Sequence, residues 1–474
     1  MVFALFASSM QKGQVQIQVR GDDGVLEDGL VFGNNPQHRL WGGVSYFWLH
    51  ACSRAHRQRA LSSMAHGHLK VVRVFITNIE GWRAKGCGGE ASRDIEPREV
   101  GEWDDDQLRS LDDLFLDAHR HGVKINLAPH DRWALGCWQT DAYVKKYNLP
   151  VSRGCNEAWK NKAYAFYTNE SAFEDYSKRL AHILNYPSRH FNGRKLGEIH
   201  QVLWGVDVEN EALGHLSVSS PALAAWVCKA SEVVRAHVHE LVAVTSGGGG
   251  IGNGTYSGSA SRELGLVRGM ASCSTIDVIA LHTYASLEEA KKLLKGYAAA
   301  TATASKKRSK PVRVMLQEYG AMASTQAEKA DALESFANAS LDIAGMPFMY
   351  WDMGPKNVPL NYDVFPCDQA WQALIKTAKR AETVYSKYAW PSSWNGGGVT
   401  NSSSWKELAC DGGTMWKMIV AVASGCIIVV AFATLMYLRR RRRHIGMPKS
   451  HFAKALLADG AEIYYLGPSS PSLI

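Results

Sequence analysis

Short apolar runs alternate with longer amphipathic segments along most of the chain. The runs are rich in β-branched and aromatic residues, which is typical of buried strands. They occupy residues 41–46, 70–77, 123–128, 202–208, 241–245, 276–281, 312–317 and 347–351. The hydrophobic pattern therefore predicts a strand at each of these places, with room for a helix between consecutive strands.

The segments between the runs carry helical patterns. Residues 104–122 read DDDQLRSLDDLFLDAHRHG, with acidic residues first, basic residues last and a final glycine, an order that suits the helix dipole and the C-cap. Further helices are predicted at residues 171–184, 221–241, 286–297, 328–345 and 368–388. Strands that alternate with helices favour an α/β fold, a (β/α)8 TIM barrel, and a doubly wound open sheet is the alternative.

The pattern changes after residue 390. Residues 391–417 are rich in glycine and serine, which is typical of a stalk. Residues 418–438 carry no charge, are long enough to cross a bilayer core of about 30 Å as a single transmembrane helix, and are followed by RRRRRH. Because basic flanks stay in the cytoplasm, we expect a single-pass membrane protein with a basic cytoplasmic tail at 439–474. The residues before the helix would be extracellular or luminal.

The barrel pattern itself fills residues 14–390, which we predict to be one folded domain. Residues 1–13 contain a short apolar run without a basic region before it. A luminal domain needs a signal peptide, so this N-terminal segment is interpreted as either a truncated or an atypical one.

Charge adds little to this picture. The formal net charge is +8, and five of the positive charges stand together at residues 439–443, so little basic excess remains to suggest nucleic-acid binding. The sequence SGGGGIGNG at 246–254 contains G-x-G-x-x-G, but no apolar helix follows it, as a dinucleotide site would require. We therefore predict a flexible loop there, and neither a nucleic-acid nor a nucleotide partner.

Cysteines and glycosylation motifs fit a secretory route. Of nine cysteines, Cys426 lies in the predicted membrane span, and the remaining even number indicates disulfide bonds whose pairing the sequence leaves open. Asn169, Asn253, Asn338 and Asn401 begin Asn-x-Ser/Thr motifs, so we expect a glycoprotein. No His/Cys cluster has zinc spacing, and no metal or cofactor is predicted.

Polar and aromatic side chains gather at the carboxyl ends of the predicted strands, where barrel enzymes build their active sites. They are Arg73, His130, Asn210, Glu211, His282, Tyr284, Glu318 and Trp351. Two carboxyls about 5–5.5 Å apart are what a retaining glycosidase needs, one as acid/base and one as nucleophile. We predict that Glu211 is the acid/base and Glu318 the nucleophile.

The other side chains in this set have supporting roles in the hypothesis. Arg73 and Tyr284 would keep Glu318 ionised. Asn210 would hydrogen-bond the sugar 2-hydroxyl, and Trp351 would stack against an apolar sugar face. His130 and His282 would bind sugar hydroxyls or orient the carboxylates.

Several neighbouring residues are ambiguous. Asp207 and Glu209 alternate with Glu211 in GVDVENEALGH and are interpreted as polar packing inside the barrel. Asp131 is either a site residue or a loop cap, and the cap is favoured. The tryptophans at 82, 133 and 138 are either sugar platforms or loop anchors.

This constellation resembles glycoside hydrolase family 5, in particular its endo-β-1,4-mannanase-like members. The resemblance covers about residues 14–388 and includes the opening segment VQIQVRGDDGVLEDGLVFGNNPQHRLWGGVSYFWL and the segment YTNESAFEDYSKRLAHILNY. It implies a retaining (β/α)8 enzyme with catalytic glutamates on strands four and seven and no cofactor. The family's Asn-Glu-Pro stands here as Asn210-Glu211-Ala212, a departure that keeps both functional side chains.

The sequence thus predicts a membrane-anchored retaining β-glycoside hydrolase that acts through a glycosyl-Glu318 intermediate. β-1,4-Mannan is the first choice of polysaccharide substrate, and a β-glucan or glucosylceramide is the alternative. A catalytically silent carbohydrate-binding receptor is the rival from another class. The sequence leaves endo or exo action and the oligomeric state open.

Overall fold

A computed structural model describes residues 19–20, 26–27, 39–136, 141–151, 163–212, 220–248, 260–356 and 361–385. The chain divides into two compact units, residues 1–405 and residues 406–474, and all described residues belong to the first. Among them, no helix combines the length and the apolar character that a bilayer crossing needs. The predicted N-terminal segment (1–13), stalk (391–417), transmembrane helix (418–438) and tail (439–474) lie outside the described residues.

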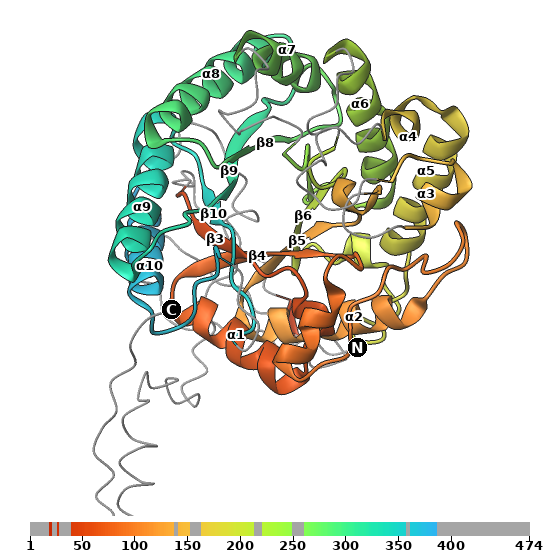
Figure 1. Cartoon of the computed structure of the whole chain (residues 1–474), viewed down its shortest axis with the longest axis horizontal. Helices are drawn as coiled ribbons and strands as arrows, with labels where there is room; N and C mark the ends of the chain where they lie inside the picture. Colours follow the sequence, from red (N-terminus) through yellow and green to blue (C-terminus); the bar gives the residue numbers. More distant parts are fainter. Residues whose placement is uncertain are drawn as a thin grey trace, which may run out of the picture. The chain divides into compact units, whose positions relative to one another are not determined.

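Eight parallel strands close into a barrel, with helices arranged in a ring around it (Figure 1). The strands are β3 (Gly42–Ser45), β4 (Leu69–Phe75), β5 (Lys124–Ala128), β6 (Leu203–Asp207), β7 (Ala243–Thr245), β8 (Val278–Thr283), β9 (Arg313–Tyr319) and β10 (Phe348–Tyr350). Their order around the barrel follows the chain, and β10 pairs with β3 to close it. Closure confirms the predicted (β/α)8 barrel and excludes the open sheet.

All eight strands fall on the predicted apolar runs. Side chains of a parallel barrel are covered by helices on one face and by the barrel interior on the other, which is why the strands read as continuous apolar runs. Seven of the strands are buried at every residue, and β4 has a single partly exposed position, Lys70.

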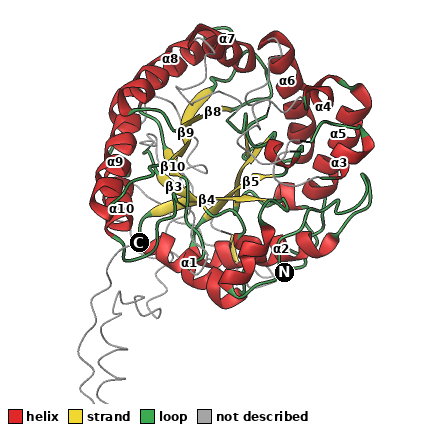
Figure 2. Cartoon of the chain, in the orientation of Figure 1, coloured by secondary structure: helices red, strands yellow, loops and turns green. Residues whose placement is uncertain are grey.

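The longer helices cover the outside of the barrel (Figure 2). They are α1 (Arg54–His66), α2 (Asp105–His121), α5 (Glu170–Leu184), α6 (Ser220–His237), α7 (Ala260–Ala271), α8 (Leu287–Ser305), α9 (Gln326–Ala339) and α10 (Gln369–Ala381). Short elements in the connections are η1 (Leu49–Ala51), η2 (Gly81–Cys87), η3 (Arg132–Ala134), α3 (Ala142–Lys146), α4 (Tyr164–Thr168), η5 (Leu196–Glu198) and the π-helical η6 (Ser340–Ala344). A further pair, β1 (Val19–Arg20) and β2 (Leu26–Glu27), is antiparallel.

Helix α2 begins and ends where its sequence predicts. The Asp104 side chain accepts a hydrogen bond from the Asp106 backbone N–H, and Gly122 adopts the left-handed conformation at the C-cap, with φ 66°. That conformation is easy for glycine because it has no Cβ. Helices α1 and α7 were not predicted from the sequence.

Two disulfide bonds have both of their cysteines among the described residues. Cys52 pairs with Cys87, linking the segments around η1 and η2, and Cys228 in α6 pairs with Cys273 after α7. Cys367 is disulfide-bonded as well. The presence of disulfides, predicted from the even cysteine number, is confirmed.

Candidate active site

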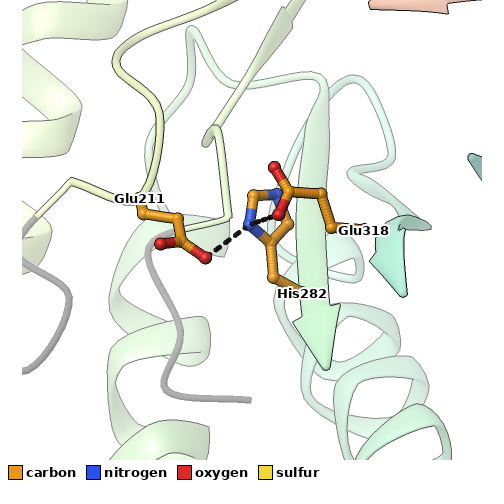
Figure 3. A group of neighbouring side chains, drawn as sticks. All are labelled: Glu211, His282 and Glu318. Atoms are coloured by element: carbon orange, nitrogen blue, oxygen red, sulfur yellow. Dashed lines mark hydrogen bonds and ion pairs between the residues drawn. The ribbon is translucent and has the colours of Figure 1, made fainter. Parts of the chain in front are cut away.

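The predicted catalytic glutamates face each other across the mouth of the barrel. Glu211 follows β6, Glu318 lies in β9, and His282 in β8 stands between them (Figure 3). One carboxylate oxygen of each glutamate and one ring nitrogen of His282 lie within 4.8 Å of one another. The structure therefore brings together two carboxyl groups that are 107 positions apart in the sequence (318 − 211).

Glu318 is buried and held at both carboxylate oxygens. Arg73 forms an ion pair with Oε1, and the Tyr284 hydroxyl donates a 2.8 Å hydrogen bond to Oε2. Burial raises the pKa of Glu318, and the charge of Glu211 adds to this, while His282, Arg73 and Tyr284 act in the opposite direction. The predicted contacts of Arg73 and Tyr284 with Glu318 are thus present, but burial outweighs them and the pKa of Glu318 is raised.

Glu211 is more open than Glu318. Its side chain is 17% exposed, against 5% for Glu318. The indole Nε1 of Trp133 donates to its Oε2 at 2.6 Å, and Nδ1 of His282 lies 3.0 Å from its Oε1. By burial alone, Glu318 would be the carboxyl that holds the proton, so the predicted roles of the pair depend on the contacts of Arg73 and Tyr284, which favour the ionised form of Glu318.

Backbone contacts beyond the end of β6 position Glu211. The Asn210 N–H donates to the His130 carbonyl at 2.9 Å, and the Glu211 N–H donates to the Gly247 carbonyl at 2.7 Å. Glu211 itself has φ 50°, in the left-handed region. The regular alternation of a strand therefore ends before Glu211, and its side chain points to the mouth of the barrel independently of Asp207 and Glu209.

Arg73 connects the two strands that carry the glutamates. Besides the ion pair with Glu318, its Nε donates to Asp207 at 2.8 Å and its Nη2 donates to Asn210 Oδ1 at 2.7 Å. Asn210 also hydrogen-bonds Asp131 through its side chain. An amide nitrogen has two N–H donors, so the sugar hydroxyl contact predicted for Asn210 would have to use the second one.

Asp207 provides the polar packing that the sequence predicted. It is fully buried and accepts from Arg73, and its Oδ1 also accepts from Asn126 at 3.0 Å, from Gln317 at 2.8 Å and from the Thr245 hydroxyl. Asn126 and Gln317 were not identified from the sequence, although Gln317 stands directly before Glu318 at the end of a predicted strand.

His130 contacts two carboxylates other than Glu211 and Glu318. Its Nδ1 is 2.6 Å from Glu209 and its Nε2 is 2.9 Å from Asp141, in a fully buried position. Burial alone would lower the pKa of His130, but the hydrogen bonds to Asp141 and Glu209 outweigh it and raise the pKa to about 10. Of the two roles considered for His130, the structure shows contact with carboxylates, and these are not the catalytic ones.

Trp351, the predicted sugar platform, packs against two other aromatic rings. The ring of Trp351, half-buried after β10, meets Phe47 and Phe75 edge-on with centroids 5.7 and 5.6 Å apart. These two rings fix its orientation, as a sugar platform needs. Trp82 is 52% exposed, and Trp138 lies outside the described residues.

Asp131 caps η3, the interpretation that the sequence favoured. Its side chain accepts from the Trp133 N–H at 2.9 Å. Burial raises the pKa of Asp131 to about 7, and the charge of Glu211 also raises it. The cap thus anchors the loop from which Trp133 reaches Glu211.

Comparison with known proteins shows which solved structures share this fold. No protein-family model matches the chain, and no curated protein matches it significantly. An endo-1,4-beta-mannanase from Rhizomucor miehei is 17% identical, covers 74% of this chain and 97% of its own, and has a TM-score of 0.56. An endo-beta-1,4-mannanase from Thermotoga petrophila is 19% identical with coverages of 74% and 78% and a TM-score of 0.54.

A glycoside hydrolase family 5 mannosidase from Rhizomucor miehei is similar too. It is 14% identical, covers 78% of this chain and 100% of its own, and has a TM-score of 0.55. At these identities the likeness establishes a shared fold. The resemblance to family 5 barrels with mannanase-like members, inferred from the sequence, is therefore confirmed in three dimensions.

Proposed function

We propose that this chain is a retaining β-glycoside hydrolase. The observation that carries the proposal is the meeting of Glu211 and Glu318, with one carboxylate oxygen of each inside the 4.8 Å group that includes His282. Retaining enzymes hold their two carboxyls about 5–5.5 Å apart, whereas inverting enzymes separate them by about 6.5–9.5 Å to admit a water molecule. The short separation favours double displacement.

In the first step, Glu318 attacks the anomeric carbon while Glu211 donates its proton to the glycosidic oxygen. The bond to the leaving group breaks, and a covalent glycosyl-Glu318 ester forms. In the second step, Glu211 removes a proton from water, the water oxygen attacks the anomeric carbon, and the ester bond breaks to restore the Glu318 carboxylate.

The surrounding contacts suit each step. Arg73 and Tyr284 bind the Glu318 oxygens and orient them for attack. When the ester forms, Glu318 loses its negative charge, so the repulsion between the two carboxylates that favours a proton on Glu211 disappears. The same carboxyl therefore serves first as an acid and then as a base.

A β-1,4-linked mannan is the proposed substrate, and the similarity to solved mannanases and mannosidases supports it. A β-glucan or glucosylceramide would require the same two glutamates and is the alternative. The predicted helix at 418–438 supports a membrane-anchored enzyme with its barrel outside the cell or in a lumen.

A hydrolysis assay with the full chain in detergent tests the proposal on mannan, β-glucan and glucosylceramide. Glu211→Gln should lower kcat by about 10²–10⁴-fold, because it removes the general acid/base, and Glu318→Gln should abolish turnover. Glu198→Gln is the matched control, since Glu198 is exposed in η5, ahead of β6. If the wild type hydrolysed none of the three substrates, like both variants, but still bound sugar, the result would favour the catalytically silent receptor.

A further inference from the structure

His282 presents one ring nitrogen to both catalytic carboxylates. Its Nδ1 lies 3.0 Å from Glu211 Oε1 and 3.3 Å from Glu318 Oε2 (Figure 3). Three potential ligand atoms from three different strand ends thus converge within 4.8 Å. Two carboxylate oxygens therefore face a single imidazole nitrogen.

The other nitrogen of His282 fixes the tautomer of the ring. Gln317 donates its amide N–H to Asp207 at 2.8 Å, so its carbonyl Oε1 is the atom that lies 3.0 Å from His282 Nε2. A carbonyl only accepts, which means that Nε2 carries a proton. In the neutral imidazole, the lone pair of Nδ1 therefore faces the two glutamates.

Charge around the three atoms is predominantly negative. Asp207, Glu211 and Glu318 contribute three carboxylates, and Arg73 ion-pairs with Asp207 and Glu318. Trp133 donates to Glu211 Oε2 and Arg73 contacts Glu318 Oε1, so in both glutamates the other oxygen faces His282. A proton on Nδ1 can balance the excess charge, and so can a metal cation bound in its place.

We propose that Glu211, His282 and Glu318 form a Zn²⁺ site that competes with substrate for the catalytic centre. One imidazole with two carboxylates suits zinc, whereas magnesium and calcium prefer oxygen-only sites. Tetrahedral zinc with ligands at about 2.0–2.1 Å has ligand–ligand edges of about 3.3 Å. The two edges from Nδ1 measure 3.0 and 3.3 Å, and the edge between the two carboxylate oxygens lies within 4.8 Å.

Gln317 completes the site as a positioning residue. Zinc-binding imidazoles nearly always donate their second N–H to an oxygen acceptor, which orients the ring and keeps the metal-binding nitrogen unprotonated. Here that acceptor is Gln317 Oε1, itself held by Asp207. The metal would inhibit, because it would tie up both glutamates that the proposed hydrolysis requires.

Calorimetric titration of the full chain with ZnCl₂ tests binding independently of hydrolysis. We expect one saturable site in the wild type that is lost in Glu211→Gln and in His282→Gln, and no binding of MgCl₂ at the same concentrations. His190→Ala is the control. His190 lies 2.7 Å from Asp113 near the surface, so this variant shows whether a surface histidine and carboxylate account for the zinc that is bound. Equal zinc binding by the wild type and the folded Glu211→Gln protein would overturn the proposal, even if His282→Gln failed to fold.

A second variant tests the positioning role. Gln317→Met keeps all three ligands but removes the acceptor from Nε2, and should weaken zinc binding about 10- to 100-fold. An unchanged zinc affinity would refute the tautomer argument.

The hydrolysis assay tests inhibition. Zinc should raise KM without changing kcat, and a chelator should restore the original KM. Only this inhibition rests on the proposed function. If the protein bound zinc but hydrolysed none of the three substrates, the zinc site would be supported and the proposed hydrolase activity would be refuted.

Discussion

The hydrogen bond from Trp133 sets Glu211, the proposed acid/base, apart from an ordinary surface glutamate. The donor lies 78 positions away in the sequence and reaches Oε2 at 2.6 Å. A bond to a charged group contributes about 1.5–3 kcal/mol, and it holds the carboxyl toward His282. Neither of the roles considered for Trp133 from the sequence, sugar platform or loop anchor, describes this contact.

Replacing the indole tests its importance. Trp133→Phe keeps an aromatic ring but removes the N–H, so we expect kcat/KM to fall about 10- to 100-fold, in line with a lost bond to a carboxylate. Trp103→Phe should leave kcat/KM unchanged, because Trp103 stacks on His182 of α5 and contacts none of the candidate site residues that the structure describes. Steady-state kinetics on the preferred polysaccharide decide; equal rates in both variants would mean that the indole N–H has no catalytic effect.

His130 gives the protein a measurable pH dependence of stability. Its folded pKa is about 10, above the ordinary value of 6.5, because Glu209 and Asp141 hold the proton. The stabilisation of the folded protein by protonated His130 is therefore complete below pH 6.5, and it is lost as the pH rises from 6.5 through 10.

Thermal unfolding at several pH values checks this. The Tm of the wild type should fall more between pH 6.5 and 10 than that of His130→Gln, whose uncharged side chain has no proton to lose. The two proteins should differ most at low pH and converge at high pH. Parallel curves would show that His130 is not a buried cation.

At the level of elements, the loop after β7 packs against His282, which lies between the two proposed catalytic glutamates. Gly247 and Gly248 have φ values of 67° and 77°, and a Cβ on Gly248 would stand 2.2 Å from Nε2 of His282. The glycine-rich stretch predicted as a flexible loop near the substrate therefore begins with two glycines that the site itself requires.

Gly248→Ala should displace the His282 ring and reduce kcat/KM by about 100-fold, the effect of misplacing a catalytic group by about 1 Å. Gly265→Ala is the matched control, because Gly265 lies in α7, where an added Cβ would have open space out to 4 Å. That exchange should keep activity and slightly raise Tm, since alanine favours a helix. Comparable kinetics in both variants would show that the close approach is not needed.

Elements with strong periodic patterns were predictable and others were not. Helix α2 carries its own caps and an apolar stripe, and it is found where expected. Helix α1 reads RAHRQRALSSMAH and buries only a few apolar residues, so packing against the barrel stabilises it more than its own pattern does. Helix α7 contains two glycines and follows a glycine-rich stretch, which hid it from the same reasoning.

For the whole molecule, glycosylation reports on which side of a membrane the barrel lies. Asn169 caps α5 through its Oδ1 and is exposed, whereas Asn338 lies in α9, where its Oδ1 accepts from Arg380. A glycan attaches at the side-chain nitrogen of an accessible asparagine. Asn169 is therefore the better acceptor of the two.

Peptide-N-glycosidase treatment of the protein from secretory cells checks the predicted topology. We expect a mass shift that Asn169→Gln reduces and Asn338→Gln leaves unchanged. A wild-type protein without any shift, together with modification of the 439–474 tail by a luminal reagent, would reverse the proposed orientation.

The amino-acid sequence by itself determined the barrel and the location of its chemistry. Strand positions follow from local hydrophobic periodicity, and parallel strands bring their carboxyl ends to one face, so Arg73, Glu211 and Glu318 had to lie near that face. The predicted membrane span likewise depends only on local composition and stays a prediction.

The tertiary structure alone decided which of these groups touch. Arg73 meets Glu318 across 245 positions and Gln317 meets Asp207 across 110. Such contacts depend on how side chains are oriented in the closed barrel. Glu211 is an example, because its positive φ turns it away from the direction that the alternation of β6 would give it. The local sequence pattern placed the carboxylates at the mouth of the barrel. Packing in three dimensions brought Glu211 next to Glu318 and Glu209 next to His130.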